Sequence, residues 1–158
     1  MDYIIREMRE DEYPLLKDFL YEAIFQRDEN NLLPKEIIEM PEIRIYIEDF
    51  GKKKDDYCLC AVVEDKVVGA VWVRIIEGFG CVDSQTPELA IALYKEYRRM
   101  GIGRKLMEEM LNLLKEKGYR KTSLSVQKDN YAAEMYLKLG YIIKETKNEE
   151  YIMEYVLR

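Results

Sequence analysis

The stretch Glu96-Tyr97-Arg98-Arg99-Met100-Gly101-Ile102-Gly103-Arg104 follows a strand-like apolar run, Leu89-Ala90-Ile91-Ala92-Leu93, and precedes a long helical pattern. Glycine lets the backbone turn sharply and approach a ligand closely, because it has no Cβ. The first amide groups of a helix are free to donate hydrogen bonds and carry a partial positive charge. A glycine-rich turn between a strand and a helix therefore suits the binding of a phosphate group. The alternative is a plain strand-to-helix connection with solvated arginines.

A second informative segment lies downstream and reads Asn130-Tyr131-Ala132-Ala133-Glu134-Met135-Tyr136-Leu137-Lys138-Leu139-Gly140-Tyr141. It resembles the Asn-x-x-Ala-x-x-x-Tyr-x-x-x-Gly-Phe segment of the GNAT N-acetyltransferase superfamily. The upstream Arg-x-x-Gly-x-Gly pattern, formed by Arg98, Gly101 and Gly103, is similar to the acetyl-CoA pyrophosphate loop of the same superfamily. Two motifs in the expected order are more specific than either alone. The resemblance is specific over roughly residues 88–141 and weak before them.

The resemblance implies a GNAT fold of the α+β class. That fold has a mixed, mostly antiparallel seven-stranded sheet, flanked by about four helices and splayed between its fourth and fifth strands. The residue pattern by itself predicts only an α+β order with one strand-helix-strand unit, at about residues 89–127. A chain of 158 residues with 48% apolar content is long enough for one sizeable core, so we expect a single domain over residues 1–158.

Hydrophobic periodicity and turn residues predict the individual elements. Strands are expected over residues 3–8, 57–63, 67–76, 89–94, 121–127, 141–143 and 151–157. Helices are expected after a cap at Asp11, over two short segments at residues 35–40 and 42–50, and over residues 101–117 and 131–139. Gly69 suggests a bulge, and Gly118 and Gly140 are expected to end the last two helices.

The resemblance also implies which residues bind acetyl-CoA. The backbone amides of about residues 100–104 would hold the pyrophosphate, with two arginines adding charge-assisted contacts. The end of the fourth strand would offer main-chain groups to the pantetheine arm. The expected cofactor-binding residues are Leu93, Tyr94, Arg98, Arg99, Met100, Gly101, Ile102, Gly103, Arg104 and Asn130. Asn130 also has a sufficient structural role as a helix cap, and both roles stay open.

Tyr136 stands where the resemblance places the general acid that protonates the departing CoA thiolate. A phenol with an ordinary pKa of about 10 can donate a proton to a thiolate whose conjugate acid has a pKa near 8.5. The alternative is structural, because the chain has 13 tyrosines and Tyr136 shares a helical face with apolar residues. We favour the catalytic role.

The absence of histidine narrows the choice of general base to a carboxylate or a water chain, and excludes histidine-based triads and mixed Cys/His zinc sites. Glu88 is the best single candidate for the base. It begins the fourth strand, on the side of Ala90 and Ala92 if side chains alternate. The three cysteines lack Cys-x-x-Cys spacing and are expected to be reduced thiols, and no metal is expected.

Charge and hydropathy limit the partners. The net charge of −6, with no concentrated basic segment, argues against binding to nucleic acid, and no apolar run approaches the ~20 residues of a membrane span. We therefore expect a cytoplasmic protein. The resemblance implies that it is an enzyme that transfers an acetyl group from acetyl-CoA directly to an amine. A non-catalytic acyl-CoA sensor, a donor with a longer acyl group, and a homodimer formed through the closing strands remain open.

Overall fold

The structure is a computed structural model that describes residues 1–158. Its seven strands form one sheet in the order β1-β2-β3-β4-β5-β7-β6. The strands are β1 (Ile4–Glu7), β2 (Tyr57–Val63), β3 (Lys66–Arg74), β4 (Glu88–Leu93), β5 (Lys121–Gln127), β6 (Ile142–Lys147) and β7 (Glu150–Val156). All neighbouring pairs are antiparallel except β4 and β5, which run parallel. The predicted mixed, mostly antiparallel seven-stranded sheet is confirmed.

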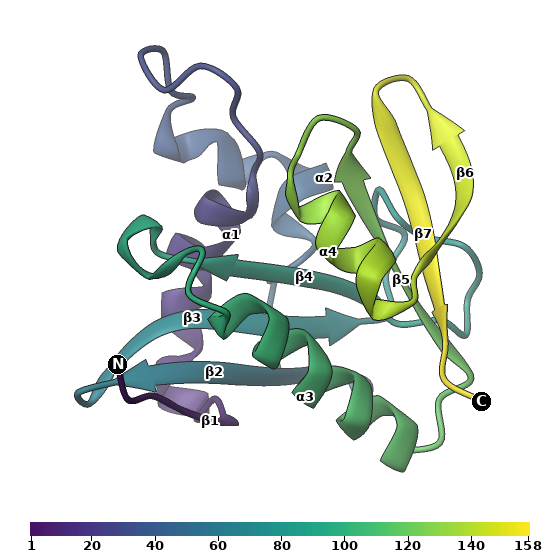
Figure 1. Cartoon of the computed structure of the whole chain (residues 1–158), viewed down its shortest axis with the longest axis horizontal. Helices are drawn as coiled ribbons and strands as arrows, with labels where there is room; N and C mark the ends of the chain where they lie inside the picture. The colour runs from purple at the N-terminus through teal and green to yellow at the C-terminus, as the bar shows by residue number, and fades with distance from the viewer.

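Strands β4 and β5 separate almost as soon as they meet. Their only register pair joins Glu88 to Ser123, and the Ser123 amide donates to the Pro87 carbonyl over 3.0 Å. Beyond this point the two strands diverge, while β5 stays paired with β7 along its whole length (Figure 1). The predicted splay is therefore present, with Glu88 at its closed end and the carboxyl ends of both strands at its open end.

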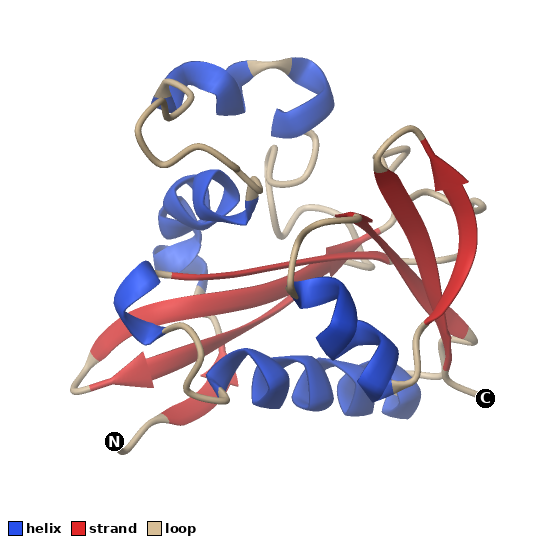
Figure 2. Cartoon of the chain, turned by 45° about the horizontal axis from the view of Figure 1, so that its top comes forward, coloured by secondary structure: helices blue, strands red, loops and turns tan.

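Helices cover both faces of the sheet (Figure 2). The long helix α3 (Ile102–Glu116) and helix α4 (Ala132–Leu139) lie on one face, and α1 (Leu16–Ala23) and α2 (Pro41–Arg44) lie on the other. Three 3-10 segments complete the chain: η1 (Glu10–Leu15), η2 (Lys35–Glu39) and η3 (Lys95–Tyr97). Alternation along the strands divides the buried side chains into two clusters, one beneath α3 and α4 and one beneath α1.

Glycines end the two helices of the first face as predicted. Gly118 and Gly140 have φ angles of +89° and +117°, in the left-handed region that favours glycine after a helix. At the start of α4 the Asn130 side chain accepts a hydrogen bond from the Ala132 amide over 2.9 Å, which is the capping role predicted for it.

The predicted cap at Asp11 is wrong. A 3-10 segment precedes α1, and the residue at its N-terminal boundary is Arg9. The Glu12 amide donates to the Arg9 carbonyl over 2.9 Å, and the Glu12 carboxylate accepts the Arg9 amide over 2.8 Å. This reciprocal pair begins the 3-10 segment two residues before Asp11 and satisfies the amides of Arg9 and Glu12.

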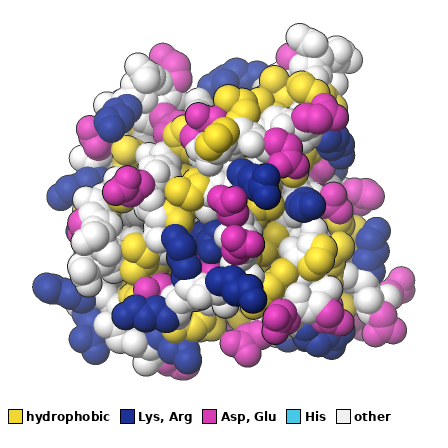
Figure 3. Space-filling view, turned by 180° about the vertical axis from the view of Figure 1, so that it is seen from behind, with side chains coloured by type: hydrophobic (Ala, Val, Ile, Leu, Met, Phe, Trp, Pro, Cys, Tyr) yellow, Lys and Arg dark blue, Asp and Glu magenta, His cyan; other side chains and the backbone are white.

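Gly69 lies beside an irregularity in the β2–β3 pairing, where the register shifts opposite Ala61 and Val62. A Cβ at Gly69 would come within 2.2 Å of Leu93 Cδ2 and 3.1 Å of the Ala92 carbonyl oxygen, so a larger residue there would require the Leu93 side chain to move. On the molecular face seen in Figure 3, basic and acidic side chains are interspersed. None of the helices combines the length and the apolar character needed to cross a membrane.

Candidate functional site

The connection from β4 to α3 presents a row of free amide groups. The backbone amides of six consecutive residues, 99 to 104, donate no hydrogen bond within the protein, and the first amide of this region to do so is that of Lys105, which donates to the Gly101 carbonyl over 3.2 Å. These amides lie at the N-terminus of a 15-residue helix, where the helix dipole adds partial positive charge. Such an array is suited to bind an anion.

The backbone of this connection turns in the left-handed region twice. Arg99 has a φ angle of +62° and Gly101 a φ angle of +86°. Alternation of this kind directs successive amides toward one concave side. No atom lies within 4 Å of the position that a Cβ on Gly101 would occupy, so the space above the loop is open to a ligand.

The arginines of the connection differ in what they contact. Arg98 Nε donates to the Leu93 carbonyl over 3.0 Å, and Arg98 Nη2 donates to the Glu22 carboxylate over 3.0 Å and to the Glu22 carbonyl over 3.3 Å. The guanidinium of Arg99 lies 5.0 Å above the ring of Tyr131, at the start of α4. Arg104 is half exposed and pairs with Glu108 within α3. Of the three arginines, Arg98 is thus the one whose guanidinium makes several hydrogen bonds to other protein groups.

The main chain of β4 offers hydrogen-bonding groups to the splay. The Tyr94 amide donates to the Val68 carbonyl over 3.0 Å and is therefore used within the sheet. Because neighbouring residues of a strand direct their main-chain groups to opposite edges, those of Leu93 and Ile91 face the open side of β4. Of the two residues predicted to offer main-chain groups here, Leu93 and Tyr94, only Leu93 has main-chain groups that face the splay.

Tyr136 projects from α4 into the core cluster beneath α3 and α4. Its ring lies 5.8 Å from that of Tyr141, and burial raises the pKa of its phenol above the ordinary value. The hydroxyl makes no hydrogen bond to another residue, so its proton is not committed elsewhere. The phenol is protonated at neutral pH and is able to donate.

Glu88 is buried at the closed end of the splay, where its side chain is 2% exposed. It lies on the same face of β4 as Ala90 and Ala92, which pack on the α1 side, as predicted. Its Oε2 accepts hydrogen bonds from the Tyr46 hydroxyl and from the Gly80 amide, the latter over 3.0 Å. Burial raises the pKa of the carboxyl above its ordinary value, and these two donors, together with the nearby Gly78 amide, oppose the rise. Tyr136 and Glu88 therefore lie on opposite faces of the sheet.

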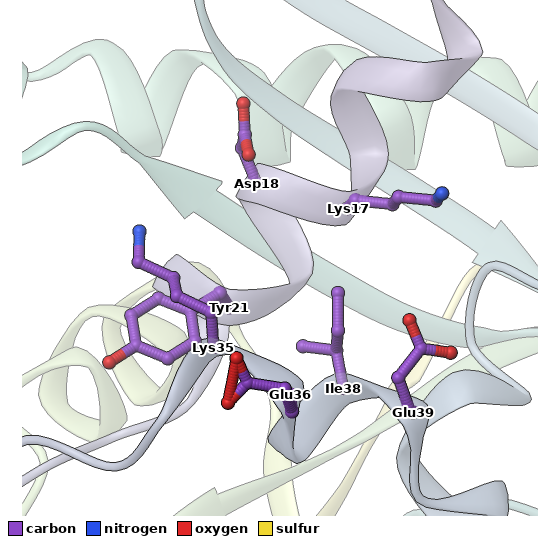
Figure 4. A pocket seen from close by; sticks show the side chains of 7 residues that line it. All are labelled: Lys17, Asp18, Tyr21, Lys35, Glu36, Ile38 and Glu39. Atoms are coloured by element: carbon purple, nitrogen blue, oxygen red, sulfur yellow. The ribbon is translucent and has the colours of Figure 1, made fainter.

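A cavity of about 280 Å³ opens on the α1 side of the sheet. Residues of α1 and η2 line it, and the ring of Tyr21 lies beside Lys35 (Figure 4); the lining residues are Lys17, Asp18, Tyr21, Lys35, Glu36, Ile38 and Glu39. Asp18 also contacts the Tyr94 hydroxyl at 3.4 Å. The lining carries both signs of charge, so its electrostatics do not select one class of ligand.

Two features of this region were not predicted from the sequence. The first is Tyr46, whose hydroxyl bonds to Glu88 although 42 residues separate them. No local pattern distinguishes Tyr46 from the other tyrosines. The second is the pair Gly78 and Gly80. Their Gly-x-Gly spacing, which ends eight residues before Glu88, is a signal that the backbone there approaches another group closely.

Comparison with known proteins agrees with this geometry. A profile described as the acetyltransferase (GNAT) family matches residues 5–141. A GNAT-family acetyltransferase from Streptococcus pneumoniae is 24% identical, with a TM-score of 0.69 over 98% of this chain and 99% of that one. The PaiA N-acetyltransferase from Thermoplasma acidophilum, solved in complex with coenzyme A, is 22% identical, with a TM-score of 0.69 over 99% of both chains.

The ribosomal-protein-S18-alanine N-acetyltransferase from Escherichia coli is 16% identical, with a TM-score of 0.68 over 99% of this chain and 94% of that one. At these identities the likeness shows the fold. No curated protein matches the sequence.

Proposed function

Because the chain belongs to the acetyltransferase (GNAT) family, which uses acetyl-CoA, we propose that it is an N-acetyltransferase that moves an acetyl group from acetyl-CoA directly to a primary amine. The observation that carries the proposal is the row of free amides at residues 99–104, at the open end of a splayed sheet. These amides fit a pyrophosphate, because they supply many converging donors and the space above Gly101 is empty.

The residues that would hold acetyl-CoA follow from this geometry. The amides from Arg99 to Arg104 would bind the pyrophosphate, with Arg104 supplying a flexible positive charge. The main chain of Leu93 and Ile91 would pair with the pantetheine arm along the free edge of β4. Arg98 would act through the loop that it fixes, since two of its nitrogen atoms are already bonded to protein groups. Asn130 would serve chiefly to begin α4.

When bound, acetyl-CoA supplies a thioester whose carbonyl carbon is open to attack by an amine. The chain contributes the proton transfers. Glu88 Oε1 would accept the proton that the amine loses as its nitrogen bonds to the acetyl carbon, and Tyr136 Oη would donate a proton to the sulfur as the carbon–sulfur bond breaks. Holding both substrates in one orientation would supply much of the remaining acceleration.

Direct transfer is favoured over an acetylated cysteine. Cys81 is partly buried, whereas the other two cysteines are fully buried, and this partial burial together with the nearby carboxylate of Glu88 raises the pKa of its thiol. A thiol of raised pKa is a poor nucleophile at neutral pH, because the thiolate is the reactive form.

The test follows release of free thiol from acetyl-CoA against a panel of small amines, amino acids and peptides, with the wild type beside Tyr136→Phe. We expect release that depends on an amine, and a fall in kcat of about a hundredfold or more in the variant. Calorimetry with CoA supplies an independent measurement. Binding of CoA without release against any amine would favour the second candidate, a non-catalytic acyl-CoA sensor. The absence of both binding and release would overturn the proposal.

Comparing acetyl-CoA with propionyl-CoA and succinyl-CoA in the same assay defines the acyl group. Size-exclusion chromatography with light scattering tests whether the chain forms a homodimer. The exposed edge strand β6 is the surface we propose for such pairing.

A further inference from the structure

One oxygen of the Glu88 carboxylate accepts two hydrogen bonds, and the other accepts none. Its Oε2 receives the Tyr46 hydroxyl and the Gly80 amide. Its Oε1 is fully buried and has no hydrogen-bond partner. Buried polar atoms are nearly always paired, so a buried carboxylate oxygen without a partner indicates a group that can still accept a hydrogen bond or a proton.

Tyr46 is itself held firmly in place. Trp72 Nε1 donates to the Tyr46 carbonyl over 3.0 Å, and Arg74 Nη1 donates to the carbonyls of Ile45 and Glu48, each over 2.9 Å. The ring of Tyr46 stacks on Phe79, with centroids 6.2 Å apart and planes within 15°. Strand β3 thus fixes the backbone on both sides of Tyr46, and the loop after β3 fixes its ring.

The loop that carries Gly78 closes tightly over the pair. A Cβ at Gly78 would lie 2.6 Å from Tyr46 Oη and 2.7 and 2.8 Å from the two Glu88 oxygens. The Phe79 amide donates to Tyr46 Oη over 2.9 Å. The hydroxyl therefore accepts from the loop and donates to Glu88, so the direction of its proton is determined by its surroundings.

We propose that Tyr46 is a positioning residue for acetyl transfer: it fixes Oε2 of Glu88, so that Oε1 alone remains to take the proton of the acceptor amine. The inference rests on the proposed function. A rigid donor prevents the carboxylate from rotating, and a carboxylate held within reach of its proton is a more effective base than one that samples several orientations.

The charges around Glu88 determine the direction of the expected pH effect. Its cross-strand neighbour Arg74 is committed to Asp56, with which it forms a buried ion pair at 2.9 Å. Cys81 of the covering loop and Glu150 of β7 are the other titratable groups that act on this site. Tyr46 therefore supplies the main side-chain stabilisation of the carboxylate form. Its removal raises the pKa of Glu88, because a hydrogen bond to the charged form favours that form.

The experiment compares the pH profile of kcat/KM in the wild type, Tyr46→Phe and Tyr119→Phe. Tyr119 is the matched control, since its hydroxyl also donates to a carboxylate, that of Asp55, away from the site. In Tyr46→Phe we expect kcat to fall about tenfold or more, the acidic limb to move up by about one pH unit, and the KM for acetyl-CoA to stay within about twofold. In Tyr119→Phe we expect the wild-type profile.

Two further measurements distinguish this role of Tyr46 from a loss of folding in the variant, and one of them does not depend on the proposed enzymatic activity. Adding Tyr46→Phe to Glu88→Gln should cost little more than Glu88→Gln alone, because both act on one proton transfer. Carbon-13 NMR titration of the Glu88 carboxyl, with no ligand present, should give a higher pKa in Tyr46→Phe.

Two outcomes would overturn the role of Tyr46 and leave the proposed function standing. One is an NMR titration of Glu88 that is unchanged in Tyr46→Phe. The other is a loss of activity that only parallels a loss of stability, with the pH profile unchanged. A wild type that binds CoA but transfers nothing would overturn the proposed enzyme, and this role with it.

Discussion

Arg98 Nη2 lies 3.0 Å from a carboxylate oxygen of Glu22, and this ion pair joins the loop after β4 to the last turn of α1. The same nitrogen also donates to the Glu22 carbonyl, one of the carbonyls that a helix leaves free at its C-terminus. Arg98 Nε meanwhile holds the Leu93 carbonyl. One side chain therefore ties the α1 side of the sheet to the candidate pyrophosphate loop.

Removing this tie should weaken cofactor binding. In Glu22→Ala, Arg98 loses its charged partner and the loop becomes more mobile, so we expect the Kd for CoA to rise about tenfold, which is about 1.4 kcal/mol. Calorimetry measures the Kd. Glu109→Ala is the control, because Glu109 forms an exposed pair with Lys105 on α3 and its loss should leave the Kd unchanged. Tighter binding in Glu22→Ala would show instead that Glu22 competes with phosphate for Arg98.

The backbone of Gly101 can be tested against a glycine of matched geometry. Gly101 and Gly118 stand at opposite ends of α3, with φ angles of +86° and +89°, and a Cβ meets no close atom at either site. Alanine at either position should destabilise the fold by a similar amount, about 1 kcal/mol. Only Gly101→Ala should also weaken CoA binding, because it redirects the free amides. Equal Kd values in the two variants would argue against the loop as the pyrophosphate site.

The ion pair of Arg74 and Asp56 is buried, with side chains 2% and 0% exposed. Asp56→Asn would leave the guanidinium without a counter-charge, and we expect the free energy of unfolding to fall by about 3–5 kcal/mol. Thermal unfolding should show this as a Tm lower by roughly 10 °C. Glu39→Gln, which removes an exposed pair with Arg44, should change the Tm by about 2 °C or less. A stable Asp56→Asn variant would show that Arg74 is satisfied by its carbonyl contacts alone.

Acid should destabilise the N-terminal segment through Glu12. Two hydrogen bonds from Arg6, over 2.8 and 2.9 Å, hold the pKa of Glu12 at about 2. Because the folded pKa lies below the ordinary value near 4.5, ionised Glu12 contributes stability above pH ~4.5, and this contribution is lost as the pH falls toward 2. Denaturant unfolding of the wild type and Glu12→Gln should therefore converge on acidification. A difference in stability that stays constant over this pH range would contradict the assignment.

Much of the local structure was predictable. The β-branched run of β2, the periodic apolar face of α3 and the glycines after α3 and α4 act over a few residues each, so spacing alone reveals them. The Asp11 cap failed because Glu12 and Arg9 form a competing local pair. In the candidate site, the turn into α3 at about residues 100–104 was predictable because backbone conformation depends on nearby glycines. The commitment of Arg98 to Glu22 was not, because these residues are 76 positions apart.

Short-range patterns along the chain show where it turns, which faces are apolar, and that residues 98–104 and 130–141 resemble the two motifs of an acetyltransferase. The tertiary structure decided which of the polar groups meet. It brought Tyr46 to Glu88, Arg74 to Asp56 and Arg98 to Glu22, and it left one oxygen of Glu88 vacant. Such pairs depend on how sheet and helices pack, because a buried charge is stable only beside a partner that the fold carries to it from elsewhere in the chain.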